Sequence, residues 1–234
     1  MGTFDRAHAV RAVWVKILCI RQWIGRRTFL PRLCTEGVAV DDIYGEHRHK
    51  MEEALDQLVE RIKELKSELQ DEMVFNPIEH VLARVKSDES MREKLRRKGL
   101  PETTESALTS VYDALGIRIV CAFLSDVYTI RDHIVSDPNV EVIEERDYIR
   151  QSKPNGYRSL HLILRSRDGY FAEVQLRTIS MDTWAALEHH LQYKKTHVGN
   201  QRLIVQELKR CADELAATDL SMQTLRDMIL TEES

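Results

Sequence analysis

Two acidic side chains lie at positions where strands are expected, and they are the first candidates for chemistry. Asp113 comes just before the β-branched run at 116–123, and Glu173 lies among apolar neighbours at 170–177. A carboxylate inside a sheet costs free energy unless it is paired or binds a metal. Two carboxylates on adjacent strands would form an anionic oxygen site suited to Mg²⁺. The alternative is an exposed edge position with an arginine salt bridge, and the spacing leaves both interpretations open.

A basic segment offers groups that could bind phosphate. Residues 84–98 hold seven basic and three acidic side chains. Arg84 and Lys86 precede Ser90 and Lys94, and this spacing suits a polyphosphate clamp across the start of a helix. A solvated helix face is the usual meaning of such a run, so this segment also has two interpretations.

The most concentrated polar stretch of the chain combines charge, a turn and an aromatic ring. Lys153 supplies charge, Asn155 with Gly156 favours a tight turn, and Tyr157 offers a flat ring on which a base could stack. An ordinary turn between strands, with His161 as a satisfied strand residue, is the alternative. Acids for Mg²⁺, cations for phosphate and a stacking ring together indicate phosphoryl chemistry on nucleotides. The residues alone do not say which phosphorus is attacked.

The hydrophobic periodicity predicts the helices that must position these residues. Apolar residues step by three and four between Ile43 and Leu69, which predicts an amphipathic helix. Asn76 as N-cap and Pro77 in the first turn predict a second helix that runs to about Lys86. Further helices are predicted at 126–135, 181–195 and 200–230.

The middle of the chain changes to the period of strands. The dipeptide at 168–169, Asp-Gly, predicts a hairpin between two of them. Helices, then a sheet of about four or five strands, then helices indicate an α+β or mixed α/β domain. The predicted strands are 116–123, 140–149, 159–164 and 170–177.

The composition is that of a globular protein. The chain has 234 residues, of which 43% are hydrophobic and 31% are charged. No apolar run approaches the roughly 20 residues that a membrane-spanning helix needs, so we expect no span. The four cysteines are far apart and form no C-x-x-C pair, which argues against a disulfide scaffold or a structural zinc site and fits a reducing cytoplasm.

The N-terminal part differs from the rest in charge. Residues 1–40 carry seven basic and two acidic side chains. Apolar residues between Val10 and Ile24 follow a helical stripe, so a helix that touches a membrane surface or nucleic acid is one interpretation. We favour a poorly ordered extension, or a start codon assigned too far upstream, because the domain pattern begins near Asp41. We therefore expect a basic extension at 1–40 and one domain at 41–234.

Four ordered stretches carry a family resemblance. They are NPIEHVLARVKSDESMREKLRRKG (76–99), DALGIRIV (113–120), KPNGYRSLH (153–161), and EVQLRT with MDTWAALEHHLQYK (173–178 and 181–194). The chain resembles the synthetase domain of the RelA/SpoT-type (p)ppGpp synthetases, and its length resembles that of the small alarmone synthetases. The resemblance implies a nucleotidyltransferase-like mixed sheet of about five strands, flanked by long N- and C-terminal helices.

The activity that this resemblance implies is pyrophosphate transfer. The β,γ-diphosphate of ATP would move to the ribose 3′-hydroxyl of GDP or GTP, giving (p)ppGpp for stringent-response signalling and AMP. By resemblance, Asp113 and Glu173 hold Mg²⁺, and Glu173 is the candidate base for the 3′-hydroxyl. Synthesis without hydrolysis is expected, because the His-Asp pair that marks the hydrolase domain of the long relatives is absent. Similar small synthetases are homotetramers, so we expect a homo-oligomer, with the long helices as contact surfaces.

The resemblance also implies two nucleotide sites. Arg84 and Arg118 would sandwich the adenine of ATP, since guanidinium planes stack on rings. Tyr157 would stack on the guanine of the acceptor. The residues that would hold the ATP phosphates are Lys86, Ser90 and Lys94. The residues that would line the acceptor site are Lys153, Asn155, His161 and Gln175.

Two other functions stay open at this stage. One is a non-catalytic module that binds nucleotide or RNA, motivated by the basic extension and the basic segment 84–98. Its binding would depend strongly on salt and persist without Mg²⁺. The other is a nucleotidyltransferase that moves AMP and releases pyrophosphate. It would use similar acids, so only the released product distinguishes it.

Overall fold

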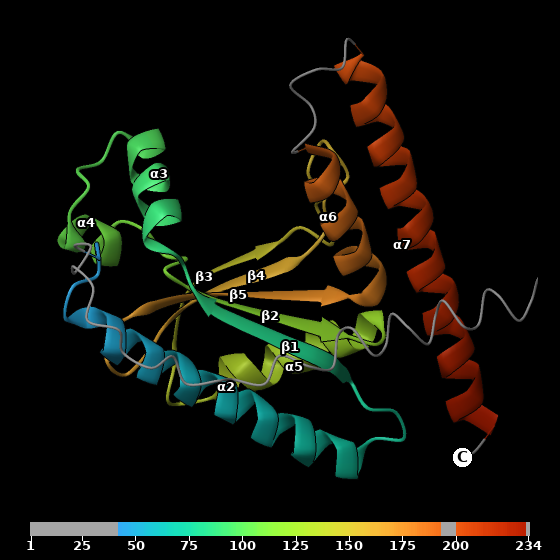
Figure 1. Cartoon of the computed structure of the whole chain (residues 1–234). Coiled ribbons are helices and arrows are strands. Elements are labelled where there is room, and N and C mark those ends of the chain that lie inside the picture. Colours follow the sequence, from blue (N-terminus) through green and yellow to red (C-terminus); the bar gives the residue numbers. More distant parts are fainter. Residues whose placement is uncertain (1–41, 193–199, 233–234) are drawn as a thin grey trace, which may run out of the picture. The chain divides into compact units, whose positions relative to one another are not determined.

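The computed structural model describes residues 42–192 and 200–232, and the predicted basic extension at 1–40 lies outside them (Figure 1). None of the helices in these two ranges is both long and apolar enough to cross a bilayer. The described helices are α2 (His47–Glu72), α3 (Asp88–Lys98), α4 (Thr104–Thr109), α5 (Leu124–Ser136), α6 (Ile179–Gln192) and α7 (Gln201–Glu232). The described strands are β1 (Ile78–Val85), β2 (Leu115–Cys121), β3 (Glu141–Asp147), β4 (Leu160–Arg165) and β5 (Phe171–Thr178).

The strands form a five-stranded mixed sheet in the order β1-β2-β5-β4-β3. Strands β2 and β5 are parallel neighbours at the centre of the sheet, and the other pairs are antiparallel. The predicted hairpin joins β4 to β5, and Gly169 supplies the positive φ of its turn (+84°). The prediction of a mixed sheet flanked by long helices is therefore confirmed.

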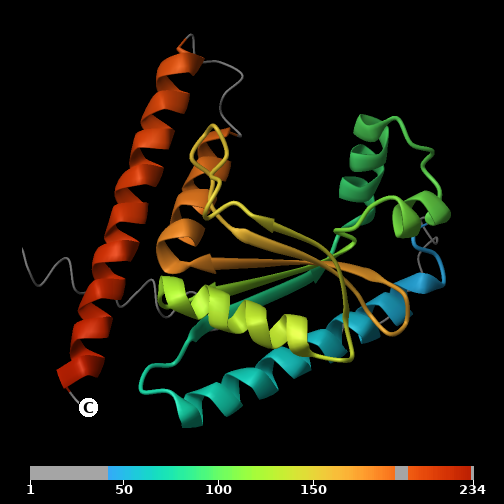
Figure 2. The same cartoon turned by 180° about the vertical axis from the view of Figure 1, so that it is seen from behind.

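The sheet has one apolar and one polar face. Alternation along β2 and β5 sends their apolar residues to the side that α2 and α5 cover, as Figure 2 shows from behind. The opposite face carries polar residues between α3 and α6 (Figure 1). The buried residues on the covered side are Leu115, Ile117 and Ile119 of β2, and Ala172, Val174 and Leu176 of β5.

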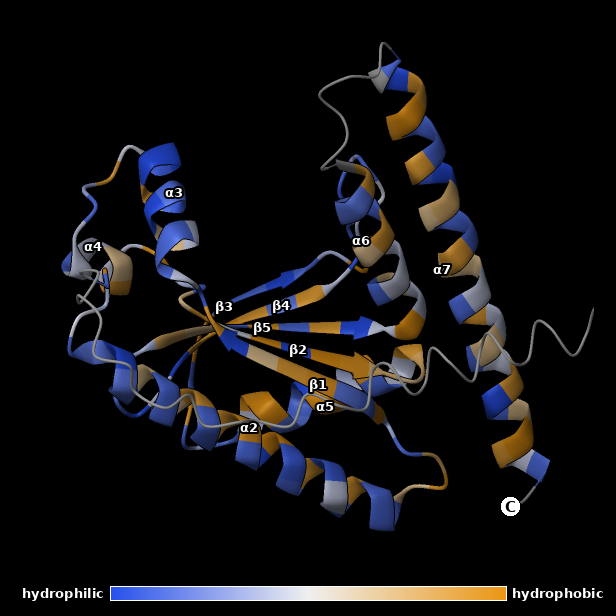
Figure 3. Cartoon of the chain, viewed as in Figure 1, coloured by the Kyte–Doolittle hydropathy of each residue, from blue (hydrophilic) through white to orange (hydrophobic). Residues whose placement is uncertain are grey.

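Helix α2 packs on the sheet through the predicted stripe. Its buried residues Met51, Leu55, Ile62, Leu65 and Leu69 recur at helical spacing, so one face of the helix is apolar and the other is solvated. Figure 3 shows in colour how hydrophilic and hydrophobic residues recur along α2. The helix thus covers the hydrophobic core on one side of the sheet, and the polar face on the other side stays open to ligands.

The predicted helix from Asn76 to about Lys86 is wrong, because this segment is the edge strand β1. Asn76 does make a cap-like hydrogen bond, since its Oδ1 accepts from the backbone N–H of Ile78 at 3.1 Å. That turn leads into a strand, however, because β2 offers a partner with which residues 80–85 pair in register. Tertiary pairing thus overrides the local helical signal.

Helix α7 lies against α6 and α5 rather than on the main core. A separate small cluster joins α6 to α7 through Trp184, Leu208 and Ala212. The indole N–H of Trp184 donates to the carbonyl of Leu208 at 2.9 Å. This attachment matters for the site, because the partly buried ring of Tyr157 packs against the same cluster.

Candidate active site

A cleft opens on the polar face of the sheet, over the strands β1, β2 and β5. Its volume is about 190 Å³. Strand register explains why residues far apart in sequence meet there, since Arg84 of β1 pairs with Gly116 of β2, and Gly116 pairs with Glu173 of β5. Glycine at the middle position leaves space between the two functional side chains. The predicted site residues that line the cleft are Arg84, Lys86, Asp113, Arg118, Glu173 and Gln175.

Asp113 lies in the turn just before β2 and is paired through one oxygen only. Its Oδ2 accepts a hydrogen bond of 2.6 Å from Lys94 of α3 and lies 3.2 Å from Nζ of Lys86. Its Oδ1 is buried and has no hydrogen-bond partner within the described residues. A buried carboxylate oxygen without a partner is costly, so this atom is a ready acceptor for a ligand or a cation.

Glu173 accepts hydrogen bonds at both carboxylate oxygens. Nδ1 of His161 is 3.2 Å from its Oε1, and Gln175 donates to its Oε2 at 2.8 Å. Burial would raise the pKa of Glu173, but the bonds from His161 and Gln175 and the charge of Lys94 lower it to about 2. Glu173 is therefore ionised at neutral pH. Lys94 hydrogen-bonds Asp113, and its charge also favours the ionised form of Glu173.

A chain of hydrogen bonds links Tyr157 to Glu173. Nη2 of Arg177 donates to the Tyr157 hydroxyl at 2.7 Å, and that hydroxyl lies 2.8 Å from Nε2 of His161. Because a carboxylate only accepts, the Nδ1 of His161 that faces Glu173 carries a proton. These hydrogen bonds hold the Tyr157 ring beside the cleft, and Glu173 at the other end of the series stays ionised.

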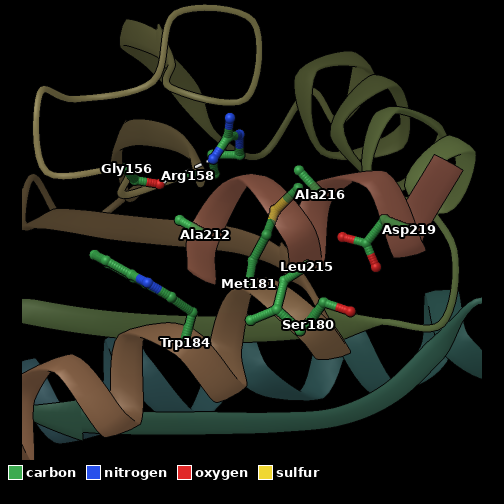
Figure 4. A pocket seen from close by; sticks show the side chains of 9 residues that line it. All are labelled: Gly156, Arg158, Ser180, Met181, Trp184, Ala212, Leu215, Ala216 and Asp219. Atoms are coloured by element: carbon green, nitrogen blue, oxygen red, sulfur yellow. Dashed lines mark hydrogen bonds between the residues drawn. The ribbon is translucent and has the colours of Figure 1, made fainter. Parts of the chain in front are cut away.

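The loop that carries Tyr157 packs against α7. Gly156 has φ +93°, and a Cβ there would lie 2.6 Å from Cβ of Ala212. Arg158 donates to Asp213 of α7 at 2.9 Å. Figure 4 shows Gly156 and Arg158 beside Ala212, at a small pocket between this loop, α6 and α7. The close approach requires glycine and fixes where the ring of Tyr157 stands.

The other predicted site residues lie around these groups. Ser90 is in the first turn of α3, where its backbone N–H donates to the N-cap Ser87. Nζ of Lys153 lies 4.8 Å from the Tyr157 ring centroid. Asn155 accepts from the backbone N–H of Tyr157 at 3.2 Å, which closes the predicted turn. Ser90 and Lys153 are exposed and contact neither of the two acids.

Two central residues, Arg177 and Asp182, were not predicted as site residues from the sequence. Arg177 is only 4% exposed, yet its guanidinium reaches Tyr157, Gln175 and Asp182. A pattern could have revealed it, since residues 173, 175 and 177 are polar at the period of a strand and therefore share the open face. Asp182 follows in the first turn of α6.

The chain is similar to proteins of one known family. A family model described as the region found in RelA/SpoT proteins matches residues 83–198. The GTP pyrophosphokinase YwaC of Bacillus subtilis is 44% identical over 145 residues, which are 59% of this chain and 69% of that protein. The GTP pyrophosphokinase YjbM of the same organism is 32% identical over 74% of this chain and 84% of that protein.

Solved structures with the same fold agree. The crystal structure of small alarmone synthetase 1 from Bacillus subtilis bound to its product pppGpp superimposes with a TM-score of 0.67 at 30% identity, over 76% of this chain and 93% of that chain. Small alarmone synthetase 2 from the same organism gives a TM-score of 0.66 at 36% identity, over 75% and 93%. The similarity thus extends over about three quarters of this chain.

Proposed function

Because this chain belongs to the RelA/SpoT family, we propose that it synthesises (p)ppGpp by moving the β,γ-diphosphate of ATP to the ribose 3′-hydroxyl of GDP or GTP. In this reaction the 3′-oxygen bonds to the β-phosphorus of ATP, the bond from that phosphorus to the α,β-bridging oxygen breaks, and AMP leaves. The observation that carries the proposal is the cleft in which Asp113 and Glu173 lie with Arg84, Lys86 and Arg118.

The acidic residues fit a magnesium ion. Among the described residues no three His, Cys, Asp or Glu side chains gather into a complete metal cage. Mg²⁺ is commonly held by one or two carboxylates plus substrate phosphates, so Asp113 and Glu173 are a sufficient protein contribution. The unpartnered Oδ1 of Asp113 supports this assignment. When bound, the ion would neutralise phosphate charge and align the phosphates for transfer.

The cations of the cleft suit the donor nucleotide. Arg84 and Arg118 lie on neighbouring strands along the cleft, where their planar guanidinium groups can stack on the adenine. Lys86 and Lys94 stand beside Asp113, where they can balance the charge of the transferred phosphates. Phosphoryl transfer depends mainly on such alignment and charge neutralisation. Ser90, at the N-terminus of α3, can add a hydroxyl to the same phosphates.

The region around Tyr157, next to the cleft, suits the acceptor nucleotide. The ring of Tyr157 can stack on guanine, with Lys153, Asn155 and His161 in contact with Tyr157 and with Gln175 lining the adjacent cleft. Glu173 lines the cleft beside His161 and Gln175 and can accept the proton of the 3′-hydroxyl. Its depressed pKa makes it a weak base in the free site, so it first orients that hydroxyl and takes up its proton as the bond to phosphorus forms.

The first experiment identifies the products. The full-length protein is incubated with ATP, GDP and Mg²⁺, and the nucleotides are separated by chromatography. We expect AMP and ppGpp in equal amounts, and no turnover once the metal is chelated. Release of pyrophosphate in place of AMP would instead establish a nucleotidyltransferase. Nucleotide binding that persists without Mg²⁺ and yields no product would establish a binding module.

The second experiment tests the two acids. Asp113→Asn and Glu173→Gln keep the size of each side chain and remove its charge, so turnover should fall at least about 100-fold. Circular dichroism checks that each variant is folded. Glu141→Gln, at an exposed position of β3, is the matched control and should retain full activity. Near-normal turnover in either acid variant contradicts the metal assignment.

We further propose that the protein synthesises (p)ppGpp but does not hydrolyse it. The chain has no His-Asp dipeptide, which supports synthesis without hydrolysis, so incubation with ppGpp and Mg²⁺ should release no pyrophosphate. The cytoplasm, where both substrates are made, is the expected compartment.

We also propose that the protein is a homo-oligomer, and the family resemblance suggests a tetramer. Apolar side chains that α7 leaves exposed support this proposal (Figure 3). These are Leu220, Met222, Leu225, Met228 and Ile229.

A further inference from the structure

One carboxylate oxygen joins an arginine that lines the cleft to an arginine that contacts Tyr157. Oδ1 of Asp182 accepts a hydrogen bond of 3.0 Å from Nη1 of Arg177 and lies 3.2 Å from Nη1 of Arg118. Arg118 belongs to β2 and Arg177 to the parallel neighbour β5. Arg118 pairs in register with Gln175, two residues before Arg177, so the two arginines are diagonal neighbours on the same face. Asp182 projects from the first turn of α6 between them.

The two arginines serve different parts of the site. Arg118 lines the cleft together with Arg84 and is 36% exposed. Arg177 is buried and donates to the hydroxyl of Tyr157 at 2.7 Å and to Oε1 of Gln175 at 2.9 Å. If the proposed function holds, Arg118 contacts the donor nucleotide, whereas Arg177 positions the ring that receives the acceptor. Asp182 therefore links the two arginines.

The electrostatics show why this link is needed. Burial lowers the pKa of Arg118, the nearby charge of Arg177 lowers it further, and Asp182 opposes both effects. Nε of Arg118 is buried and has no hydrogen-bond partner within the described ranges. Two like charges are thus held together by one shared anion, and the position of each guanidinium depends on that of the other.

We propose that Asp182 is a positioning residue that couples the two nucleotide sites, so that binding of either nucleotide strengthens binding of the other. A base stacked on Arg118 fixes its guanidinium and, through Asp182, fixes Arg177 and the Tyr157 hydroxyl. Ordering these linked side chains costs conformational entropy when the first nucleotide binds. The second nucleotide then binds to a site that is already ordered and does not bear that cost. Linkage makes the effect reciprocal.

Calorimetry measures this coupling directly. Binding of GDP to the full-length protein is measured with and without an ATP analogue whose α,β bridge is a methylene group, which blocks transfer because the α,β bond is the one that breaks. The reverse titration is measured as well. We expect each nucleotide to lower the Kd of the other at least about fivefold, by equal factors in the two directions.

Three variants locate the coupling. Asp182→Asn removes the shared charge at constant size, so the coupling factor should fall to about 1 while each nucleotide alone still binds. Tyr157→Phe keeps the stacking ring and removes only the hydroxyl that Arg177 holds, and it should also abolish the coupling. Thr183→Ala, an exposed neighbour on α6, is the control and should keep the wild-type factor.

The outcomes separate this inference from the function on which it rests. A wild-type coupling factor near 1, or an unchanged factor in folded Asp182→Asn, overturns the role of Asp182. If Asp182→Asn does not fold, an unchanged factor in Tyr157→Phe overturns the proposed chain instead. Failure of the wild-type protein to bind either nucleotide alone counts against the proposed function.

Discussion

Lys94 and Asp113 form an ion pair that joins α3 to the turn before β2, with 2.6 Å between the ammonium nitrogen and Oδ2. Lys86 approaches the same oxygen from the end of β1. The Asp113 carboxylate therefore contacts two lysines at one end of the cleft that Glu173 also lines. In the proposed reaction these ammonium groups can turn to the phosphates, which would leave Asp113 free to hold Mg²⁺.

Replacing Lys94 tests this arrangement. Lys94→Met keeps the length of the chain and removes the charge, so kcat/KM for ATP should fall by about 10²- to 10³-fold. Steady-state kinetics with GDP held at saturation measure the effect. Lys63→Met, at an exposed position of α2, is the matched control and should match the wild type. A fall of less than about threefold for Lys94→Met would show that Lys94 serves only to neutralise Asp113.

Replacing Gly156 tests how the acceptor end is positioned. Gly156→Ala adds a Cβ that would lie 2.6 Å from Cβ of Ala212 at a φ of +93°, so strain and overlap with α7 combine. We expect the protein to lose about 2–4 kcal/mol of stability and the KM for GDP to rise at least about tenfold, because the loop must move with Tyr157. Urea unfolding and steady-state kinetics measure the two effects.

Gly169→Ala is the control for that experiment. Gly169 also has a positive φ (+84°), but a Cβ there meets nothing within 4 Å. It should therefore cost only the backbone strain, about 1–2 kcal/mol, and leave the KM for GDP unchanged. Equal effects of the two alanine variants on KM would show that contact with α7 does not position the loop.

The comparison of sequence with structure separates local from tertiary information. Stripes of one period, as in α2 and in β5, were predictable because each element buries one face. The strand β1 was not, because Asn76 and Pro77 begin a helix or a strand equally well and only the pairing with β2 decides between them. The N-cap signal therefore predicted the wrong element, because the edge strand β1 lacks the alternation of buried and exposed residues that marks a strand.

The same distinction holds within the candidate site. The polar character of Glu173 and of the loop around Tyr157 is visible in the residues themselves. The bridge from Asp182 to Arg118 is not, because it depends on the parallel pairing of β2 with β5 and on where α6 begins. Parallel register between distant segments has no local signature, so a charged residue that serves two strands cannot be recognised before the fold is known.

The attachment of α7 depends on a buried ion pair. Arg226 is 6% exposed and donates to the fully buried Asp126 of α5 at 2.6 Å. Arg226→Met should cost about 3–5 kcal/mol, because it leaves the Asp126 charge buried and unpaired. The double variant with Asp126→Asn should recover part of that loss. Arg210→Met, at an exposed position of α7, should change stability by less than about 0.5 kcal/mol. An equal loss in the single and double variants would show that packing, rather than charge, holds α7.

The proposed assembly predicts an effect of charge on the apolar side chains of α7. Leu225 and Met228 are 53% and 57% exposed, which is costly to leave in water but suits a contact between copies of the chain. The double variant Leu225→Glu with Met228→Glu should reduce the molar mass measured by light scattering to that of a smaller species. Ser221→Glu, also exposed on α7, is the control. An unchanged mass in the double variant would exclude this surface as the contact.

Glu173 predicts how stability depends on pH. Its pKa lies at about 2, below the ordinary value of 4.5, so the folded state binds the proton more weakly than the unfolded state does. The stabilisation is fully present above about pH 4.5 and is lost as the pH falls towards 2, and it amounts to roughly 3 kcal/mol. Glu173→Gln lacks this contribution, so the stability difference between wild type and variant should shrink across that interval. Urea unfolding at stepwise lower pH measures it, with Glu141→Gln as the control that leaves the curve unchanged. A difference that stays constant from pH 5 to pH 2 would mean that His161 and Gln175 do not stabilise the ionised carboxylate.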